Sequence, residues 1–283
     1  MGNFKRSISL ILSIVSLSIS GTQSLALASG CENGVASSAA NFSVDAAARK
    51  RVAGKVIVLV GPPAAGKGTQ SALLKERLGV LHISAGDLFR NEVQTGSELG
   101  RKLDAYMKAG KLVPAEILIA TMAKRLSEPD AAKGFILDGT PRSLDQLGDV
   151  EKMLASLGKQ FNFVININIS EDEAVRRLAG RRVCPACRGI YNLASKPPKE
   201  AGKCDDCHSA LVERADDREE TIRERFRSYR TETEPLLEEL RHRGLVYSID
   251  GDELSADEVA ETIIKILAGP KPKTPFVDLG AGI

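Results

Sequence analysis

"VIVLVGPPAAGKGTQ" (Val56–Gln70) joins five consecutive apolar residues to a glycine-rich stretch that contains one lysine. A short apolar run of this kind is typical of a buried strand, and the residues from Thr69 onward have the pattern of a helix. Glycines between a strand and a helix let backbone N–H groups approach an anion, and the helix dipole favours the same charge. The stretch therefore predicts a phosphate-binding loop, and the alternative is a simple turn with an exposed lysine.

The spacing within this stretch fits a P-loop with one difference. Gly61 is followed by four residues and then Gly66-Lys67, but Gly68 stands where the common form has Ser or Thr. A side chain at Gly66 or Gly68 would obstruct the phosphate, and Lys67 would bring a mobile charge to it. Ala64 requires a backbone angle that alanine can adopt.

Composition describes an ordinary globular protein. The chain has 283 residues, of which 43% are hydrophobic and 27% charged, enough for one large α/β domain with insertions or for two small domains. Its net charge of +2 results from 39 basic and 37 acidic residues. This balance argues against a nucleic-acid or anionic-membrane surface, so we expect a local phosphate site.

From Lys55 onward, apolar runs alternate with helical patterns, which predicts a parallel sheet flanked by helices. The predicted strands are 56–60, 80–84, 135–138, 163–169 and 246–250. The predicted helices or helix pairs are 69–78, 86–109, 115–127, 144–157, 171–179, 216–241 and 256–267. In the fourth strand isoleucine alternates with asparagine, so we expect this strand to be less fully covered than the others.

Four cysteines interrupt the alternation between residues 182 and 213. Cys184-x₂-Cys187 and Cys204-x₂-Cys207 are separated by sixteen residues, the spacing of a tetrahedral Cys₄ zinc site. A flap of about 30 residues cannot bury enough core to fold alone, and a structural zinc would supply the missing stability. Two disulfides are the alternative in an oxidising compartment. The fifth cysteine, Cys31, is expected to be removed or free.

The N-terminus has the layout of a targeting sequence. Lys5 and Arg6 precede an uncharged apolar stretch that is too short for a membrane span, and Ala26-Leu27-Ala28 follows. We predict a signal peptide over residues 1–28.

Residues 29–54 are rich in Ala and Ser and end in Arg49-Lys50-Arg51, which predicts a transit-like or linker segment. Together with the signal peptide, this segment favours an organelle, a plastid reached through the secretory pathway. A secreted protein with a flexible linker, or a mitochondrial one, is the alternative. The proline-containing tail, 269–283, is expected to be extended or disordered.

The loop "GPPAAGKGT" resembles the GxPGxGKGT loop of adenylate kinases and other nucleoside monophosphate kinases. Five further motifs follow in the order and separations of that family: "LHISAGDLFR" (81–90), "GKLVP" (110–114), "GFILDGTPRSLDQ" (134–146), "RLAGRRVC" (177–184) and "RADDREETIRERF" (214–226). The resemblance implies a kinase domain at 55–268, a P-loop NTPase-type fold whose five-stranded parallel sheet is flanked by helices. It also implies an inserted monophosphate-binding helical region at 84–113 and a long, zinc-stapled lid at 181–214.

The resemblance implies roles for the matched residues. The implied ATP site is Ala64, Ala65, Gly66, Lys67, Gly68, Thr69, Arg177, Arg181, Ile190, Tyr191 and Glu253, with Arg177 stacked on the adenine. The implied AMP site is Ala85, Arg90, Lys111, Leu112, Val113, Gly139, Thr140, Pro141, Arg142, Gln146, Arg214 and Arg225. The implied catalytic set is Lys67, Arg142, Arg181, Arg214 and Arg225, and Asp87 and Asp138 would hold Mg²⁺ through water. Guanidinium forks suit this work because they pair with phosphate in bidentate fashion.

The implied reaction is direct, reversible transfer of the ATP γ-phosphate to AMP, which gives two ADP and balances adenine nucleotides. Gln146 and the long lid favour AMP, whereas Ala85 and Thr140 depart from the usual pattern and leave UMP or CMP as the alternative. We expect a monomer with two closing flaps, ATP and AMP as partners, and no membrane contact in the mature form. The rival classes are a zinc-knuckle nucleic-acid-binding module and a regulator without turnover. The absence of Trp and the single aromatic residue of the knuckle, Tyr191, argue against the nucleic-acid reading.

Overall fold

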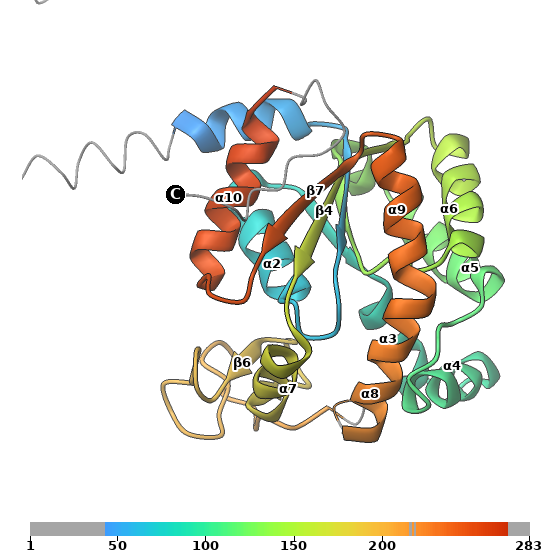
Figure 1. The fold of residues 1–283 in the computed structure, drawn as a ribbon. Helices are drawn as coiled ribbons and strands as arrows, with labels where there is room; N and C mark the ends of the chain where they lie inside the picture. Colours follow the sequence, from blue (N-terminus) through green and yellow to red (C-terminus); the bar gives the residue numbers. More distant parts are fainter. Residues whose placement is uncertain (1–42, 215–216, 218, 271–283) are drawn as a thin grey trace, which may run out of the picture. The chain divides into compact units, whose positions relative to one another are not determined.

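A five-stranded parallel sheet with helices on both faces forms the centre of the computed structural model, which describes residues 43–214, 217 and 219–270 (Figure 1). The strand order is β2-β3-β1-β4-β7. The strands are β1 (Val56–Val60), β2 (Leu81–Ser84), β3 (Phe135–Asp138), β4 (Phe161–Asn168) and β7 (Val246–Asp250). The predicted fold class is confirmed. The predicted signal peptide and nearly all of the predicted tail lie outside the described residues.

The helices match the predicted patterns, with two interruptions. They are α2 (Lys67–Leu78), α3 (Ala85–Gln94), α4 (Glu98–Lys108), α5 (Ala115–Leu126), a 3₁₀ turn (Pro129–Lys133), α6 (Leu144–Ser156), α7 (Glu171–Ala179), α8 (Glu219–Ser228), α9 (Glu234–His242) and α10 (Ala256–Ala268). Gly96, in the left-handed region, and Ser97, whose side chain caps α4, divide the helix predicted over 86–109. A π-helical segment, Tyr229–Thr233, separates α8 from α9.

Two hydrophobic clusters cover the two faces of the sheet. One includes residues of α3, α5, α6 and α9, and the other includes residues of α2 and α10. Residues 163–167 of β4 are all buried, with side chains in both clusters, and Asn166 is only 1% exposed. The expectation of a less covered strand is therefore wrong. The buried Nδ2 of Asn166 donates a hydrogen bond to Asn168 Oδ1 at 2.9 Å, so this donor has a partner.

A helix over residues 43–52 lies before β1 and was not among the predicted elements. It packs onto the cluster of α2 and α10 (Figure 1). At the opposite end of the sheet, β5 (Arg181–Val183) and β6 (Ile190–Asn192) form the antiparallel hairpin of the lid. None of the helices in the described part of the chain has the length and apolar character needed to cross a membrane.

Candidate active site

The loop between β1 and α2 has the backbone that the glycine pattern predicts. Gly66 has φ 84°, and Ala64 adopts the left-handed region at φ 63°. A Cβ atom at Gly61 would lie 2.3 Å from the carbonyl oxygen of Ile167 on β4. The loop therefore passes so close to the neighbouring strand that only glycine fits at position 61.

Lys67 begins α2 and turns its side chain back over the loop. Its Nζ donates to the carbonyl oxygens of Gly61 and Pro62, each at 2.7 Å. Burial lowers the pKa of Lys67 to about 7; the charge of Asp138 opposes this shift, and those of Arg142, Arg225 and Arg181 add to it. The ammonium thus lies among positive charges that a polyanion would neutralise.

The turn after β3 carries several of the residues that the resemblance assigns to AMP, the phosphate acceptor. Arg142 Nε donates to the Gly139 carbonyl at 2.7 Å, and a Cβ atom at Gly139 would lie 2.7 Å from Arg142 Nη2. Gln146 is 5% exposed; its amide donates to the Val113 carbonyl at 2.9 Å and accepts from the Arg142 N–H at 2.9 Å. Two residues that the resemblance assigns to AMP, Val113 and Gln146, therefore meet although 33 positions separate them. Thr140 is buried at 2% exposure and precedes a cis peptide bond to Pro141.

One cavity joins the phosphate loop to the acceptor turn. Its lining includes Gly61 and Lys67 from the loop, Leu112 and Arg142 from the acceptor side, and Arg225 from α8. Residues from four separate sequence motifs therefore line one cavity.

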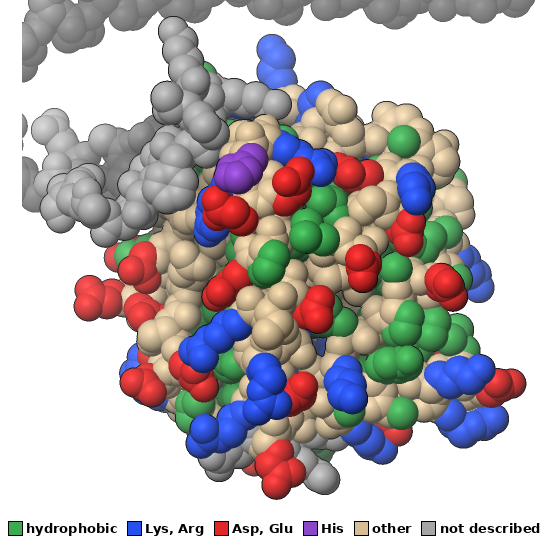
Figure 2. Space-filling model, turned by 45° about the vertical axis from the view of Figure 1, so that its right-hand side comes forward, with side chains coloured by type: hydrophobic (Ala, Val, Ile, Leu, Met, Phe, Trp, Pro, Cys, Tyr) green, Lys and Arg blue, Asp and Glu red, His purple; other side chains and the backbone are tan. Residues whose placement is uncertain are grey.

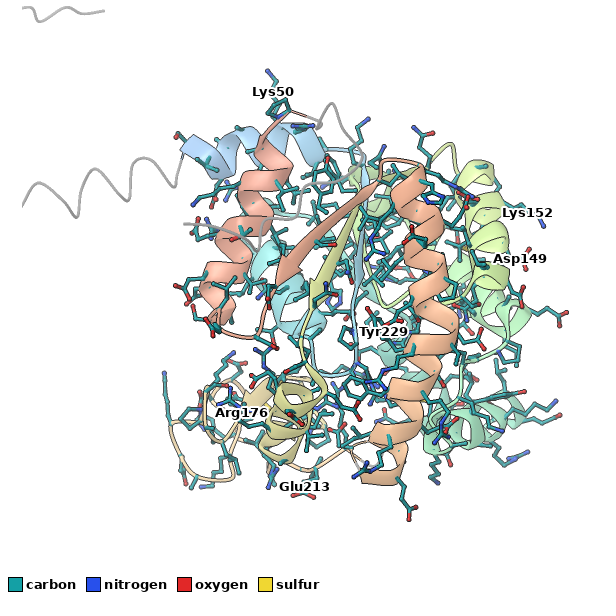
Figure 3. All side chains as sticks on the ribbon, viewed as in Figure 1. Lys50, Asp149, Lys152, Arg176, Glu213 and Tyr229 are labelled. Carbon is teal, nitrogen blue, oxygen red and sulfur yellow. The ribbon has the colours of Figure 1, made fainter. Side chains whose placement is uncertain are left out.

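The same cavity is bounded by residues that the sequence analysis missed, namely Ser228, Tyr229 and Thr233 at the end of α8 and in the π-helical segment. Figure 3 shows Tyr229 between the sheet and the continuous helical segment formed by α8, the π-helix and α9. Burial raises the pKa of Tyr229 to about 12, and the Thr233 hydroxyl donates to the Arg142 carbonyl at 2.8 Å. The predicted helix over 216–241 contained these residues but not the π-helical segment, from which Tyr229 and Thr233 reach the cavity.

Asp217 gathers two of the predicted catalytic arginines. It accepts a bidentate pair of hydrogen bonds from Arg181, and Arg225 Nη1 lies 3.7 Å from its Oδ1. The Asp217 side chain is 6% exposed, so this ion pair is largely shielded from water. Arg177 lies apart from it: its Nε donates to Glu173 at 2.5 Å and its Nη2 to the Gly251 carbonyl at 2.6 Å.

The two predicted magnesium carboxylates lie on different elements. Asp138 ends β3, and its Oδ2 lies 3.3 Å from His82 Nε2 and 3.7 Å from a Cβ atom built at Gly68. Asp87 on α3 pairs with Arg90 at 2.5 Å. Burial raises the pKa of Asp87, but Arg90, with Arg214 and Arg188, lowers it overall. Asp138 is thus beside the phosphate loop, and Asp87 faces the lid.

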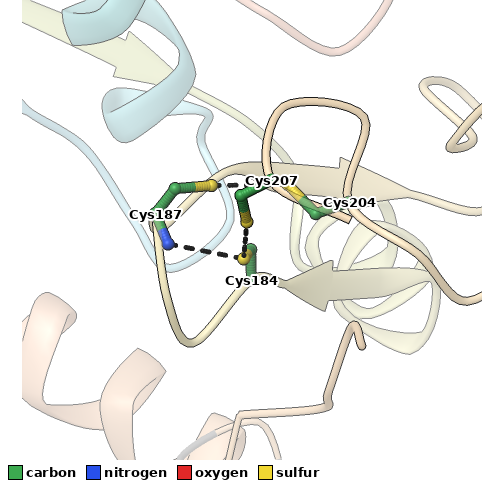
Figure 4. Close-up of side chains that lie close together, drawn as sticks. All are labelled: Cys184, Cys187, Cys204 and Cys207. Carbon is green, nitrogen blue, oxygen red and sulfur yellow. Dashed lines mark hydrogen bonds between the residues drawn. The ribbon is translucent and has the colours of Figure 1, made fainter. Parts of the chain in front are cut away.

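The four cysteines meet in the lid, at two turns of the same construction (Figure 4). The N–H of Cys184 donates to the Gly189 carbonyl and that of Cys204 to the Ser209 carbonyl, each at 2.9 Å. All four sulfur atoms lie within 4.8 Å of one another. Tetrahedral Zn–S bonds of about 2.3 Å require sulfur separations of about 3.8 Å, so this set fits a zinc ion.

Neighbouring residues of β6 point to opposite sides, as they do in any strand. A Cβ atom at Gly68 would lie 3.2 Å from Ile190 Cδ1, so Ile190 faces the phosphate loop. Tyr191 is 4% exposed, and its hydroxyl lies 3.4 Å from Cys204 Sγ. This hydrogen bond lowers the pKa of Cys204 to about 6, which favours the thiolate that a metal needs. The structure therefore brings Ile190, but not Tyr191, to the phosphate loop.

The remaining predicted residues differ in exposure. Ala65 and Ala85 are buried, Gly68 and Thr69 are partly buried, and Lys111 and Glu253 are exposed. A residue outside the predicted set, Arg188, connects the lid to α3: it donates to the Asp87 carbonyl at 3.3 Å and to the Asn91 side chain.

The sequence of this chain is similar to those of known proteins. The adenylate kinase family model matches residues 59–245. An adenylate kinase of Thermosipho melanesiensis is 44% identical over 211 residues, which cover 75% of this chain and 98% of the relative. One of Archaeoglobus fulgidus is 47% identical over 195 residues, 69% of this chain and 90% of the relative. The chain belongs to the adenylate kinase family. This adenylate kinase homologue is a phosphotransferase, and its P-loop and converging arginines support nucleoside monophosphate kinase activity.

Proposed function

We propose that this enzyme transfers the γ-phosphate of ATP to AMP, reversibly and with Mg²⁺, to give two ADP, and so balances adenine nucleotides. The observation that carries the proposal is the cavity shared by Gly61 and Lys67 on one side and Leu112, Gly139 and Arg142 on the other. A site for phosphoryl transfer between two nucleotides must hold two polyanions end to end and screen their charge. A lysine and two arginines around one cavity suit that task.

In this mechanism the phosphate loop and Lys67 hold the ATP phosphates, and Arg142 orients the acceptor phosphate. Arg181 and Arg225 turn from Asp217 toward the group in transfer, where their charge is most favourable in the transition state. The acceptor phosphate oxygen attacks the γ-phosphorus directly, so no side-chain nucleophile takes part. Closure of the lid excludes water.

Asp138 and Asp87 would hold Mg²⁺ through its water shell, because Mg²⁺ loses water reluctantly. The metal would neutralise charge on the phosphate oxygens. Asp138 suits this role better, since its carboxylate lies beside Gly68 of the phosphate loop.

The acceptor is AMP in this proposal because Gln146 and the Val113 carbonyl lie together and offer an amide and a carbonyl to a base edge. A base that carries both a donor and an acceptor, as adenine does, could replace their mutual hydrogen bond.

A substrate panel tests the proposal. The purified full chain should form ADP from ATP and AMP with Mg²⁺, and Lys67→Met should lower kcat by at least about 10³-fold. Turnover with UMP or CMP but not with AMP would overturn the assignment of AMP.

We propose a structural Zn²⁺ on Cys184, Cys187, Cys204 and Cys207, since four thiol ligands leave no open position for catalysis. Metal analysis should give about one zinc per chain, and chelation should lower the melting temperature. Two disulfides would instead be indicated by absence of zinc together with thiols that react only after reduction.

The remaining proposals concern the setting of the enzyme: a monomer in an organelle, with no nucleic-acid or membrane partner. Figure 2 shows acidic and basic side chains interspersed on the face that it presents, consistent with the near-neutral net charge. Light scattering and localisation of the tagged full chain would test these proposals.

A further inference from the structure

The helix over residues 43–52 makes contacts that a removable leader does not need. Ala48 and Val52 are 0% and 1% exposed and belong to the same buried cluster as Leu74 and Leu78 of α2 and Ile264 of α10. Val44 is packed against that cluster. Val44, Ala48 and Val52 are spaced by four residues, so they form one apolar face along the helix. This face covers one end of the packed layer formed by α2 and α10.

Ion pairs connect the same three helices. Arg77, in the last turn of α2, donates to Asp45 from Nε at 3.0 Å and from Nη2 at 2.6 Å, and to Glu261 of α10 from Nη1 at 2.7 Å. The Arg77 and Asp45 side chains are 23% and 15% exposed, so water shields this pair only in part. The hydrogen bond to Asp45 raises the pKa of Arg77, which keeps its charge fixed.

Two residues of the basic cluster Arg49-Lys50-Arg51, which suggested a transit sequence, contact the folded domain. Arg49 Nε donates to the Arg77 carbonyl at 2.5 Å, near the C-terminal end of α2, where a positive charge is favourable. The Arg51 guanidinium lies 5.5 Å from the centre of the Phe163 ring. Lys50 points away from the domain (Figure 3).

The turn after this helix is fixed to the start of the sheet. The Gly54 N–H donates to the Lys133 carbonyl at 2.8 Å, and the Phe135 N–H donates to the Lys55 carbonyl at 3.0 Å. A Cβ atom at Gly134 would lie within 2.9 Å of the backbone of Val52 and Lys55. The backbone around residues 52–55 therefore packs directly against the segment that leads into β3.

We propose that residues 43–55 are an N-terminal brace of the mature kinase, and that proteolytic removal of the predicted leader ends before Ser43. The brace holds the end of α2 remote from the phosphate loop against α10. It lies before residue 59, where the match to the family model begins. A cut at residue 54 would expose the apolar cluster and leave Arg77 without Asp45.

Two alanines of one helix provide a matched test in the full chain. Ala48 is buried and Ala47 is exposed, so Ala48→Asp places a charge in the cluster and Ala47→Asp leaves it in water. Ala48→Asp should lower the melting temperature by more than about 5 °C, and Ala47→Asp by less than about 1 °C. Equal melting temperatures of the two variants would overturn the proposal. If Ala48→Asp yields no folded protein, the melting temperature of Asp45→Asn is compared with that of Asp149→Asn. The ion pair of Asp149 with Lys152 is exposed (Figure 3), so this variant is the control. Equal melting temperatures of these two variants would also overturn the proposal.

Limited digestion of the wild-type full chain with a broad-specificity protease gives an independent readout. The resistant fragment should begin at or before Ser43, and protein isolated from its own cells should begin there too. A resistant fragment or a natural N-terminus that begins after Ser43 would overturn the proposal. Kinase turnover does not enter either test, so failure of the brace and failure of the proposed function are distinguishable.

Discussion

Binding of MgATP should transfer a proton to Lys67. In the structure, burial and nearby arginines lower the pKa of this lysine to about 7. At pH 8 roughly nine in ten Lys67 side chains are therefore neutral before binding, whereas at pH 6 roughly one in ten is. The ATP phosphates bring negative charge next to Nζ and raise its pKa well above 8, so the bound lysine is an ammonium.

The magnitude follows from linkage. Binding at pH 8 should take up about 0.9 proton at Lys67, and at pH 6 about 0.1. Lower pH should therefore favour MgATP binding, because the complex holds more protons than the free enzyme. Between pH 7 and pH 8 this single group should weaken MgATP binding about fivefold.

Isothermal titration calorimetry in buffers of different ionisation enthalpy measures this proton uptake directly. Lys67→Arg is the matched control, since a guanidinium stays charged over the whole range. If the wild type and Lys67→Arg take up the same number of protons at pH 8, the lysine does not titrate as argued. The pKa of about 7 would then be refuted, even if the enzyme is active.

Three further substitutions follow from the geometry. Gly61→Ala should abolish ATP binding and lower the midpoint of thermal unfolding, because its Cβ would lie 2.3 Å from the Ile167 carbonyl; unchanged binding in calorimetry would contradict this. Ala64→Gly should stabilise the protein by about 1 kcal/mol in urea unfolding, since alanine is strained at φ 63°; a loss of stability would contradict it. Arg188→Ala should raise the KM for ATP about threefold to tenfold without lowering kcat, because the lid loses its hydrogen bond to Asp87; a lower kcat in steady-state assays would instead indicate a role in the transfer step.

Periodicity and motif order predicted the sheet because each buried strand is a short apolar run between turn residues. The family resemblance implied a shared site for Lys67, Arg142 and Arg225, and all three line one cavity. Lys67 and Arg142 follow parallel strands, whose succeeding loops meet at one edge of the sheet. The helix over 43–52 was missed because its composition resembles a targeting segment. The spacing of Val44, Ala48 and Val52 was the available signal.

Other features depend on contacts that no local pattern encodes. Strand alternation sends the side chains of Ile190 and Tyr191 to opposite sides of β6, and the sequence analysis did not use it when it named both for the ATP site. Asp217 required knowledge of which arginines approach α8 in three dimensions. The π-helical segment Tyr229–Thr233 interrupts the α-helical period, and the sequence carries no Pro or Gly there that would have predicted the interruption.

The carboxylate of Asp217 should limit the binding of simple anions to Arg181. Because Asp217 is part of the same chain, its effective concentration at Arg181 is in the millimolar range or above, and chloride or sulfate in solution must compete against it. A triphosphate offers several oxygens at once and engages Lys67 and the loop as well, so it can displace the carboxylate where a monodentate ion cannot. The ion pair should therefore favour a multidentate ligand such as a triphosphate over a simple anion at Arg181 and Arg225.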